Sequence, residues 1–195
     1  MQVQAMISRV QQLLLNPKAA WAQIDTEAVS VQDLYKSWIA PLAAIPAVAT
    51  FVGFSLLGLG LFRMPLVSGL AQMVVGYALS LAAVYLFALI INYLAPQFGA
   101  QKNFNQAFKV AAYTPTAAWI AGIFNIIPAL AIVSLLGALY SLYLLFVGLP
   151  ALMKPPEDKA TVYTLASIGC AIVVEVVIAL VVSRLFVPAI VVGAP

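Results

Sequence analysis

The sequence contains no histidine, only one cysteine and very few charged residues. Nine lysines and arginines and six aspartates and glutamates make up 8% of the 195 residues, whereas 65% are hydrophobic. An ordinary soluble domain has about 25% charged residues, so this chain has too few charges to cover a water-facing surface. We therefore predict a polytopic membrane protein and exclude a soluble globular domain.

These shortages also exclude several kinds of functional site. Without histidine there is no Ser-His-Asp or Cys-His catalytic arrangement and no His-ligated metal site. The single cysteine, Cys170, excludes an intramolecular disulfide. The net charge is +3, and the basic residues are spread over the loops, one or two in each. This distribution is typical of signals that set the orientation of a membrane protein, and not of a nucleic-acid-binding surface. We expect no enzymatic activity, no cofactor or metal, and no nucleic-acid partner.

Residues 1–36 are predicted to form a short pair of amphipathic helices. Apolar residues recur at spacings of three and four over residues 3–14, and Asn16-Pro17 separates this helix from a second one, whose apolar edge includes Trp21. Such a pair suits the headgroup boundary on one side of a membrane. Packing of the pair against the transmembrane helices is an equally good interpretation.

Residues 37–187 are predicted to form an all-α bundle of five transmembrane helices, and residues 188–195 a short apolar tail. The uncharged run from Trp38 to Phe62 is long enough, at about 1.5 Å per residue, to cross roughly 30 Å of hydrocarbon. Two capping patterns, Ser30 with Asp33 and Asn103 with Gln106, predict where helices begin. The predicted spans are about 38–62, 66–95, 108–125, 128–150 and 159–184.

The distribution of basic residues predicts the orientation in the membrane. A cytoplasmic N-terminus places only Arg63 and Arg184 outside. The seven basic residues that it places inside are Arg9, Lys18, Lys36, Lys102, Lys109, Lys154 and Lys159. Because cytoplasmic loops carry an excess of lysine and arginine, we predict a multi-pass protein of the cytoplasmic (inner) membrane, with the N-terminus inside and the C-terminus outside.

Several short motifs resemble those of the Yip1 family, in particular its short bacterial branch. They are Asn16-Pro17 with Trp21 and Ile24, Asp33-Leu34-Tyr35, Ala112-Tyr113-Thr114-Pro115, and Tyr140-Ser141-Leu142-Tyr143-Leu144 followed by Gly148. The resemblance implies five spans and a cytoplasmic N-terminus. Eukaryotic members bind small Rab-type GTPases and each other, whereas bacteria have no such vesicle system, so the resemblance leaves the role of a bacterial member open.

Glu175 is the only acidic residue inside a predicted span. A charge at the middle of a transmembrane helix costs roughly 2.5–3.5 kcal/mol, so it usually faces the bundle interior or water. Arg184 lies on the opposite helix face, which leaves Arg63 in the first outer loop as the predicted partner. Glu175 is either a proton- or cation-coupling carboxyl or a protonated acid that hydrogen-bonds to a neighbouring helix.

Pro115 lies inside the third predicted span, beside the hydroxyls of Tyr113 and Thr114. Proline removes one backbone hydrogen bond and frees the carbonyl of Ala111. Broken helices with free carbonyls bind ions in some transporters. More often, hydroxyl side chains or water satisfy the kink.

Asn92 and Asn125 are predicted to form hydrogen bonds between helices. Small residues four apart, Ala118 with Gly122 and Gly137 with Ser141, allow helices to approach closely. This approach is either within the bundle or between two copies of the chain.

A last candidate is a cytoplasmic docking surface. It comprises Asp33, Tyr35, Lys36, Lys102 and Lys109, whose charges also fit simple orientation by the positive-inside rule.

Two hypotheses follow from the sequence. The first is a non-enzymatic membrane protein that acts by lateral association and partner binding, as a homo-oligomer or with another membrane protein. The alternative is a small ion or solute transporter or channel, in which Glu175 and the Pro115 kink line a polar path.

Overall fold

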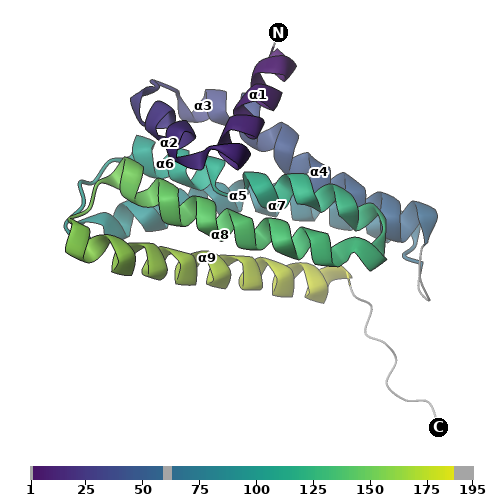
Figure 1. Cartoon of the computed structure of the whole chain (residues 1–195). Helices are drawn as coiled ribbons and strands as arrows, with labels where there is room; N and C mark the ends of the chain where they lie inside the picture. The colour runs from purple at the N-terminus through teal and green to yellow at the C-terminus, as the bar shows by residue number, and fades with distance from the viewer. Residues whose placement is uncertain (1, 59–62, 187–195) are drawn as a thin grey trace.

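A computed structural model describes residues 2–58 and 63–186, and the described part consists of helices joined by short turns, without a strand (Figure 1). The predicted all-α class is confirmed. The tail predicted at 188–195 lies outside the described residues.

The N-terminal helices α1 (Gln2–Leu15) and α2 (Pro17–Thr26) pack on the helix bundle at one end (Figure 1). Pro17 is the first residue of α2, as predicted, because a proline needs no N–H donor there. Trp21 is fully buried. The hydroxyl of Tyr140 in α8 (Ala131–Met153) donates to the carbonyl of Leu14 at 2.6 Å. Of the two interpretations of this pair, the structure therefore supports packing against the bundle.

The first predicted span is a continuous helical stretch with two wider π-helical segments. It runs through α3 (Val31–Leu34), η1 (Tyr35–Ile39), α4 (Ala40–Phe51) and η2 (Val52–Leu57). Ser30 begins it as predicted, because its hydroxyl accepts a hydrogen bond from the backbone N–H of Asp33 at 3.1 Å.

Four helical stretches are long and apolar enough to cross a membrane within the described ranges. They are Val31–Leu57, Leu66–Phe98, Ile132–Met153 and Glu157–Leu185. The second contains α5 (Leu66–Leu94) and the 3₁₀ turn η3 (Ala95–Phe98), the third lies in α8, and the fourth lies in α9 (Glu157–Phe186). These stretches correspond to the first, second, fourth and fifth predicted spans.

The third predicted span is divided into two shorter helices, α6 (Phe104–Tyr113) and α7 (Thr116–Ala121), followed by the 3₁₀ turns η4 (Gly122–Ile126) and η5 (Pro128–Leu130). Pro115 separates α6 from α7, since its ring cannot continue the helix hydrogen bonds. Asn103 begins α6 as predicted, accepting a hydrogen bond from the N–H of Gln106 at 3.2 Å. Neither half is long enough to count as a span by itself, so the number of five stays a prediction.

The core lies where α2, α6 and α8 meet, beside α5 and the start of α9. The largest fully buried side chains include those of Trp21, Tyr163, Phe108, Ile91, Leu144, Leu145 and Leu149. Small residues allow this close approach. A Cβ atom at Gly148 would contact the Trp21 ring, with Cδ2 at 2.7 Å, so only glycine fits beneath that ring.

The small-residue pairs predicted from the sequence are used inside the chain. Ser141 accepts a hydrogen bond from the backbone N–H of Ala118 at 3.0 Å, which joins α8 to α7. A Cβ atom at Gly137 would lie 2.8 Å from the carbonyl oxygen of Ala117, and one at Gly122 would lie 2.5 Å from Cβ of Pro46. Of the two alternatives, the structure shows packing within the bundle.

Candidate functional site

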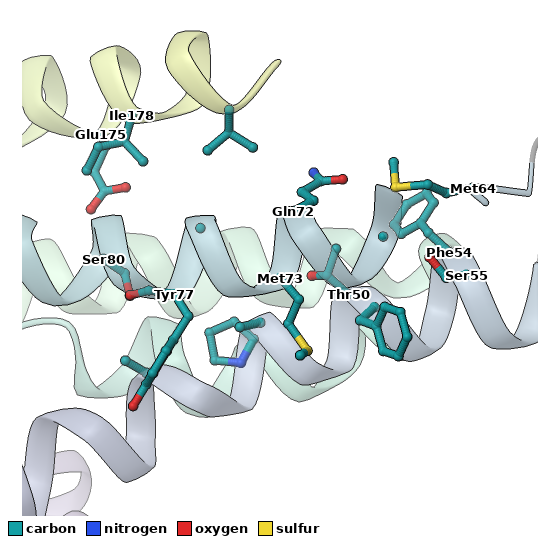
Figure 2. A pocket seen from close by; sticks show the side chains of 17 residues that line it. Thr50, Phe54, Ser55, Met64, Gln72, Met73, Tyr77, Ser80, Glu175 and Ile178 are labelled. Carbon is teal, nitrogen blue, oxygen red and sulfur yellow. The ribbon is translucent and has the colours of Figure 1, made fainter. Parts of the chain in front are cut away.

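A pocket of about 390 Å³ lies between three helical segments (Figure 2). These are the stretch formed by α4 and η2, helix α5 and helix α9. Most of its lining is apolar. The side chains that bring polar atoms to the lining are those of Thr50, Ser55, Gln72, Tyr77, Ser80 and Glu175. These helices belong to three of the four stretches that are long and apolar enough to cross a membrane.

Among the residues that the structure describes, Glu175 brings the only charged side chain to this pocket. Figure 2 shows its carboxyl group directed from α9 toward α5, on the side of Ser80. No hydrogen bond or ion pair to Glu175 forms within residues 2–58 and 63–186, where the ion pairs are Arg9 with Glu27 and Lys154 with Asp25. The carboxyl group therefore faces the pocket without a protein partner in the described part of the chain.

The predicted partnership of Arg63 with Glu175 is wrong. Arg63 donates from Nε to the carbonyl oxygen of Ser55 at 3.0 Å and from a terminal nitrogen to that of Leu56 at 3.1 Å. The last carbonyl groups of a helical segment lack helical partners and attract a cation. Gly58, which has a positive φ of 60°, packs directly against the Arg63 side chain.

Ser55 is a second unpaired polar group that lines this pocket. Its side chain is fully buried, and its hydroxyl has no hydrogen-bond partner. Tyr77 and Ser80 differ from it, because the Tyr77 hydroxyl donates to the carbonyl of Ala40 at 3.0 Å and the Ser80 hydroxyl donates to that of Tyr77 at 2.7 Å. Among the described residues, Glu175, Gln72 and Ser55 therefore bring unpaired hydrogen-bonding groups to the pocket lining.

The break at Pro115 lies elsewhere, among tightly packed aromatic rings. Tyr113 is buried, with its ring centre 4.9 Å from that of Trp38 and 6.2 Å from that of Trp21. Thr116 donates to the carbonyl of Tyr113 at 2.7 Å. The Thr114 hydroxyl is buried without a partner. None of these residues lines the pocket, so Glu175 and Pro115 do not share one path, contrary to the alternative hypothesis.

The two predicted asparagines differ in their surroundings. Asn125 in η4 donates to the Thr50 hydroxyl at 3.4 Å and accepts from the Ser134 hydroxyl at 2.7 Å, which ties η4 to α4 and α8. The side-chain oxygen of Asn92 in α5 is buried and has no partner. The structure thus shows Asn125, and not Asn92, in hydrogen bonds between helices.

The predicted docking surface does not form as one patch. Asp33, Lys36 and Lys102 are exposed. The Tyr35 hydroxyl instead donates to the carbonyl of Leu81 at 2.9 Å, and Lys109 is only 4% exposed.

Lys109 is buried because it caps α2. Its ammonium group donates to the carbonyl of Ile24 at 2.9 Å, in the last turn of that helix, where carbonyl groups need donors and attract positive charge.

Asp25 joins three helices beside Lys109, and no sequence motif predicted this role. One carboxylate oxygen accepts from Gln106 Nε2 at 2.7 Å, and the other pairs with Lys154 Nζ at 2.7 Å. Asp25 therefore connects α2 to α6 and to the end of α8. Its partners lie far away along the chain, which no local pattern reveals.

Comparisons with known proteins agree with this architecture. A family model described as the Yip1 domain matches residues 12–191. The chain is 23% identical over 183 residues to the inner membrane protein YohC of Escherichia coli K12, which covers 89% of this chain and 94% of that protein. YohC of Escherichia coli O6:H1 matches with the same identity and coverage. No solved structure matches the chain.

Proposed function

Because this chain belongs to the Yip1 family, we propose that it is a non-enzymatic protein of the inner membrane that acts by lateral association with a second copy of itself. The relatives named YohC are inner membrane proteins, which supports this location. The proposal keeps the N-terminus in the cytoplasm and the C-terminus outside, as the basic residues predict.

The face of α9 that is turned away from the bundle supports lateral association. Between residues 168 and 185, no side chain of α9 is buried, although the sequence there is apolar. The large apolar side chains exposed there are Ile172, Val173, Val176, Val177, Leu180, Val181 and Leu185, and Glu175 is exposed among them. This surface meets either lipid or another protein, because apolar side chains alone do not favour a protein over lipid tails.

Gly169 indicates whether lipid or another protein contacts this face of α9. Gly122, Gly137 and Gly148 each lie against a neighbouring segment that leaves no room for a Cβ atom. A Cβ atom at Gly169 would have nothing within 4 Å. Since glycine on a membrane helix allows a second helix to approach its backbone, an unused glycine on the open face of α9 favours a contact with another chain.

Cysteine crosslinking in native membranes tests this proposal. In a Cys170→Ala background, we expect Val173→Cys, one helical turn from Gly169, to form a disulfide-linked dimer on oxidation. Leu139→Cys, on the exposed face of α8, is the matched control and should stay monomeric. Adding Gly169→Leu should reduce the Val173 crosslink. Equal crosslinking at both positions, or none at either, would contradict the proposal.

Transport is a second candidate function, and the charged pocket is the observation that favours it. Proton and cation flux through proteoliposomes, compared between wild type and Glu175→Gln at equal incorporation, tests it. Loss of flux in the variant supports transport, whereas a silent wild type with correctly folded protein contradicts it. Pro115 is no longer part of this candidate path, because it does not line the pocket.

A further inference from the structure

The pocket between α4, α5 and α9 has the size and surroundings of a small-molecule site. Its volume of about 390 Å³ lies in the range of ligand sites, roughly 300–1,000 Å³. The apolar lining includes Phe54, Met64 and Met73 at one end, and Glu175 lies farther along, near Ser80 (Figure 2).

The charge in the pocket indicates what kind of ligand fits. A carboxylate inside a membrane span is costly unless a cation or a proton compensates it. In the part of the chain that the structure describes, no lysine or arginine pairs with Glu175, and Arg63 is bound to backbone carbonyls. The complementary molecule is therefore positively charged, a hydrogen-bond donor, and otherwise apolar.

We propose that this pocket binds an alkylammonium amphiphile, with its primary ammonium head at Glu175 and its alkyl chain along the apolar wall formed by Phe54, Met64 and Met73. The methionine side chains adapt to a chain of variable shape. An ammonium–carboxylate contact is a charge-assisted hydrogen bond, which is stronger than a neutral one. This binding is independent of the proposed association through Gly169, which does not line the pocket.

Gly76 provides a way to close the pocket without disturbing the packing. It lines the pocket, and a Cβ atom there would have nothing within 4 Å. Gly76→Leu should therefore fill the site while leaving the bundle folded. Ala138→Leu places the same side chain on the exposed surface of α8, outside the pocket, so it is the matched control.

The test uses full-length protein in nanodiscs of a neutral glycolipid, which carries no ammonium group to compete. The probes are dodecylamine and dodecanol, each with a photoactivatable diazirine in the chain, and mass spectrometry maps the labelled residues. We expect the amine to label the pocket at about tenfold lower concentration than the alcohol, since a hydrogen bond to a charged group is the stronger one. Half-labelling concentrations give this ratio directly.

The variants then separate the contribution of the Glu175 charge to probe binding from that of the pocket's shape. Glu175→Gln should bring amine labelling down to that of the alcohol and leave the alcohol unchanged. Gly76→Leu should abolish pocket labelling by both probes, and Ala138→Leu should behave as wild type. Circular dichroism and thermal unfolding check that each variant is folded, and Gly76→Ala replaces Gly76→Leu if the larger side chain prevents folding.

Three results would overturn the proposal. Equal labelling by amine and alcohol in the wild type would show an apolar void filled by any chain. An amine preference that survives Glu175→Gln would place the charge recognition elsewhere. Pocket labelling that Gly76→Leu and Gly76→Ala both leave unchanged would show that the probes bind outside the cavity.

Discussion

The two ends of the helix bundle are packed differently. Where α2 meets α6 and α8, Trp21 covers Gly148 and Lys109 caps the end of α2. Where α4, α5 and α9 meet, a pocket separates the helices and Gly76 faces open space. Glycine thus fits closely beneath Trp21 at one end, whereas at the other end Gly69 lies against Ser55 and Gly76 faces the open pocket.

This difference indicates which part of the molecule holds the fold together. In lipid, helices gain little from burying apolar side chains, because lipid tails are equally apolar, so close packing and hydrogen bonds must supply the stability. The end that contains Trp21 has close packing and the hydrogen bonds of Lys109 and Asp25, although the indole N–H of Trp21 has no partner. The end that contains Glu175 keeps an open pocket with a charged side chain in its lining and is therefore the better place for a ligand.

Trp21→Ala should have the largest effect on stability. Removal of a fully buried tryptophan leaves a cavity between α2 and α8 and should lower the free energy of unfolding by about 3–5 kcal/mol. Unfolding in mixed micelles, followed by circular dichroism during titration with dodecyl sulfate, measures it. Leu180→Ala, on the exposed face of α9, should change stability by only about 0.5 kcal/mol or less. Similar losses in both variants would show that the two regions are equally important.

Gly148→Ala should have the next largest effect on the free energy of unfolding. The added methyl group would contact the Trp21 ring and push α2 away from α8, at a cost of about 1–3 kcal/mol. The same unfolding assay measures this loss. Since the clash needs the ring, the cost should nearly vanish in a Trp21→Ala background. An undiminished cost there would mean that Gly148 acts through something other than this contact.

Asn125→Ala should have a smaller effect, of about 0.6–2 kcal/mol, the usual range for hydrogen bonds between membrane helices. The side chain joins η4 to Thr50 and Ser134. A double-mutant cycle of Asn125→Ala with Ser134→Ala, in the same unfolding assay, gives the coupling energy. Additive losses would show that the 2.7 Å contact contributes nothing to stability.

Gly76→Ala should have the smallest effect and the opposite sign to Gly148→Ala. A methyl group meets no atom within 4 Å, and alanine is the better helix former, so stability should rise by up to about 1 kcal/mol. Thermal unfolding of the purified protein measures the shift. A clear loss of stability would mean that this part of α5 is packed against something when the protein is in a membrane.

Local patterns predicted the helix ends well. Ser30 with Asp33 and Asn103 with Gln106 form the expected caps, because a capping hydrogen bond joins residues three apart. Pro115 interrupts the third predicted span as its chemistry requires. The sequence did not reveal that the interruption divides the span into two short helices, since the length of each half depends on the turns that follow.

The candidate site was predicted only in part. Glu175 lines the pocket, but its predicted partner Arg63 binds the carbonyls at the end of η2. Lys109 was assigned to an exposed surface because it is charged. It is buried, because the end of α2 needs a donor there. In each of these cases the missing information was which distant segment lies beside the residue.

The sequence by itself determined the membrane class, the helix ends and the place of an acidic residue inside a span, because hydropathy and capping act over a few neighbouring residues. The tertiary structure alone decided which polar groups have partners, which glycines lie against a neighbour and where a pocket remains. Lys109 and Ile24 are 85 positions apart, and only the packing of α6 on the end of α2 brings the ammonium group to that carbonyl.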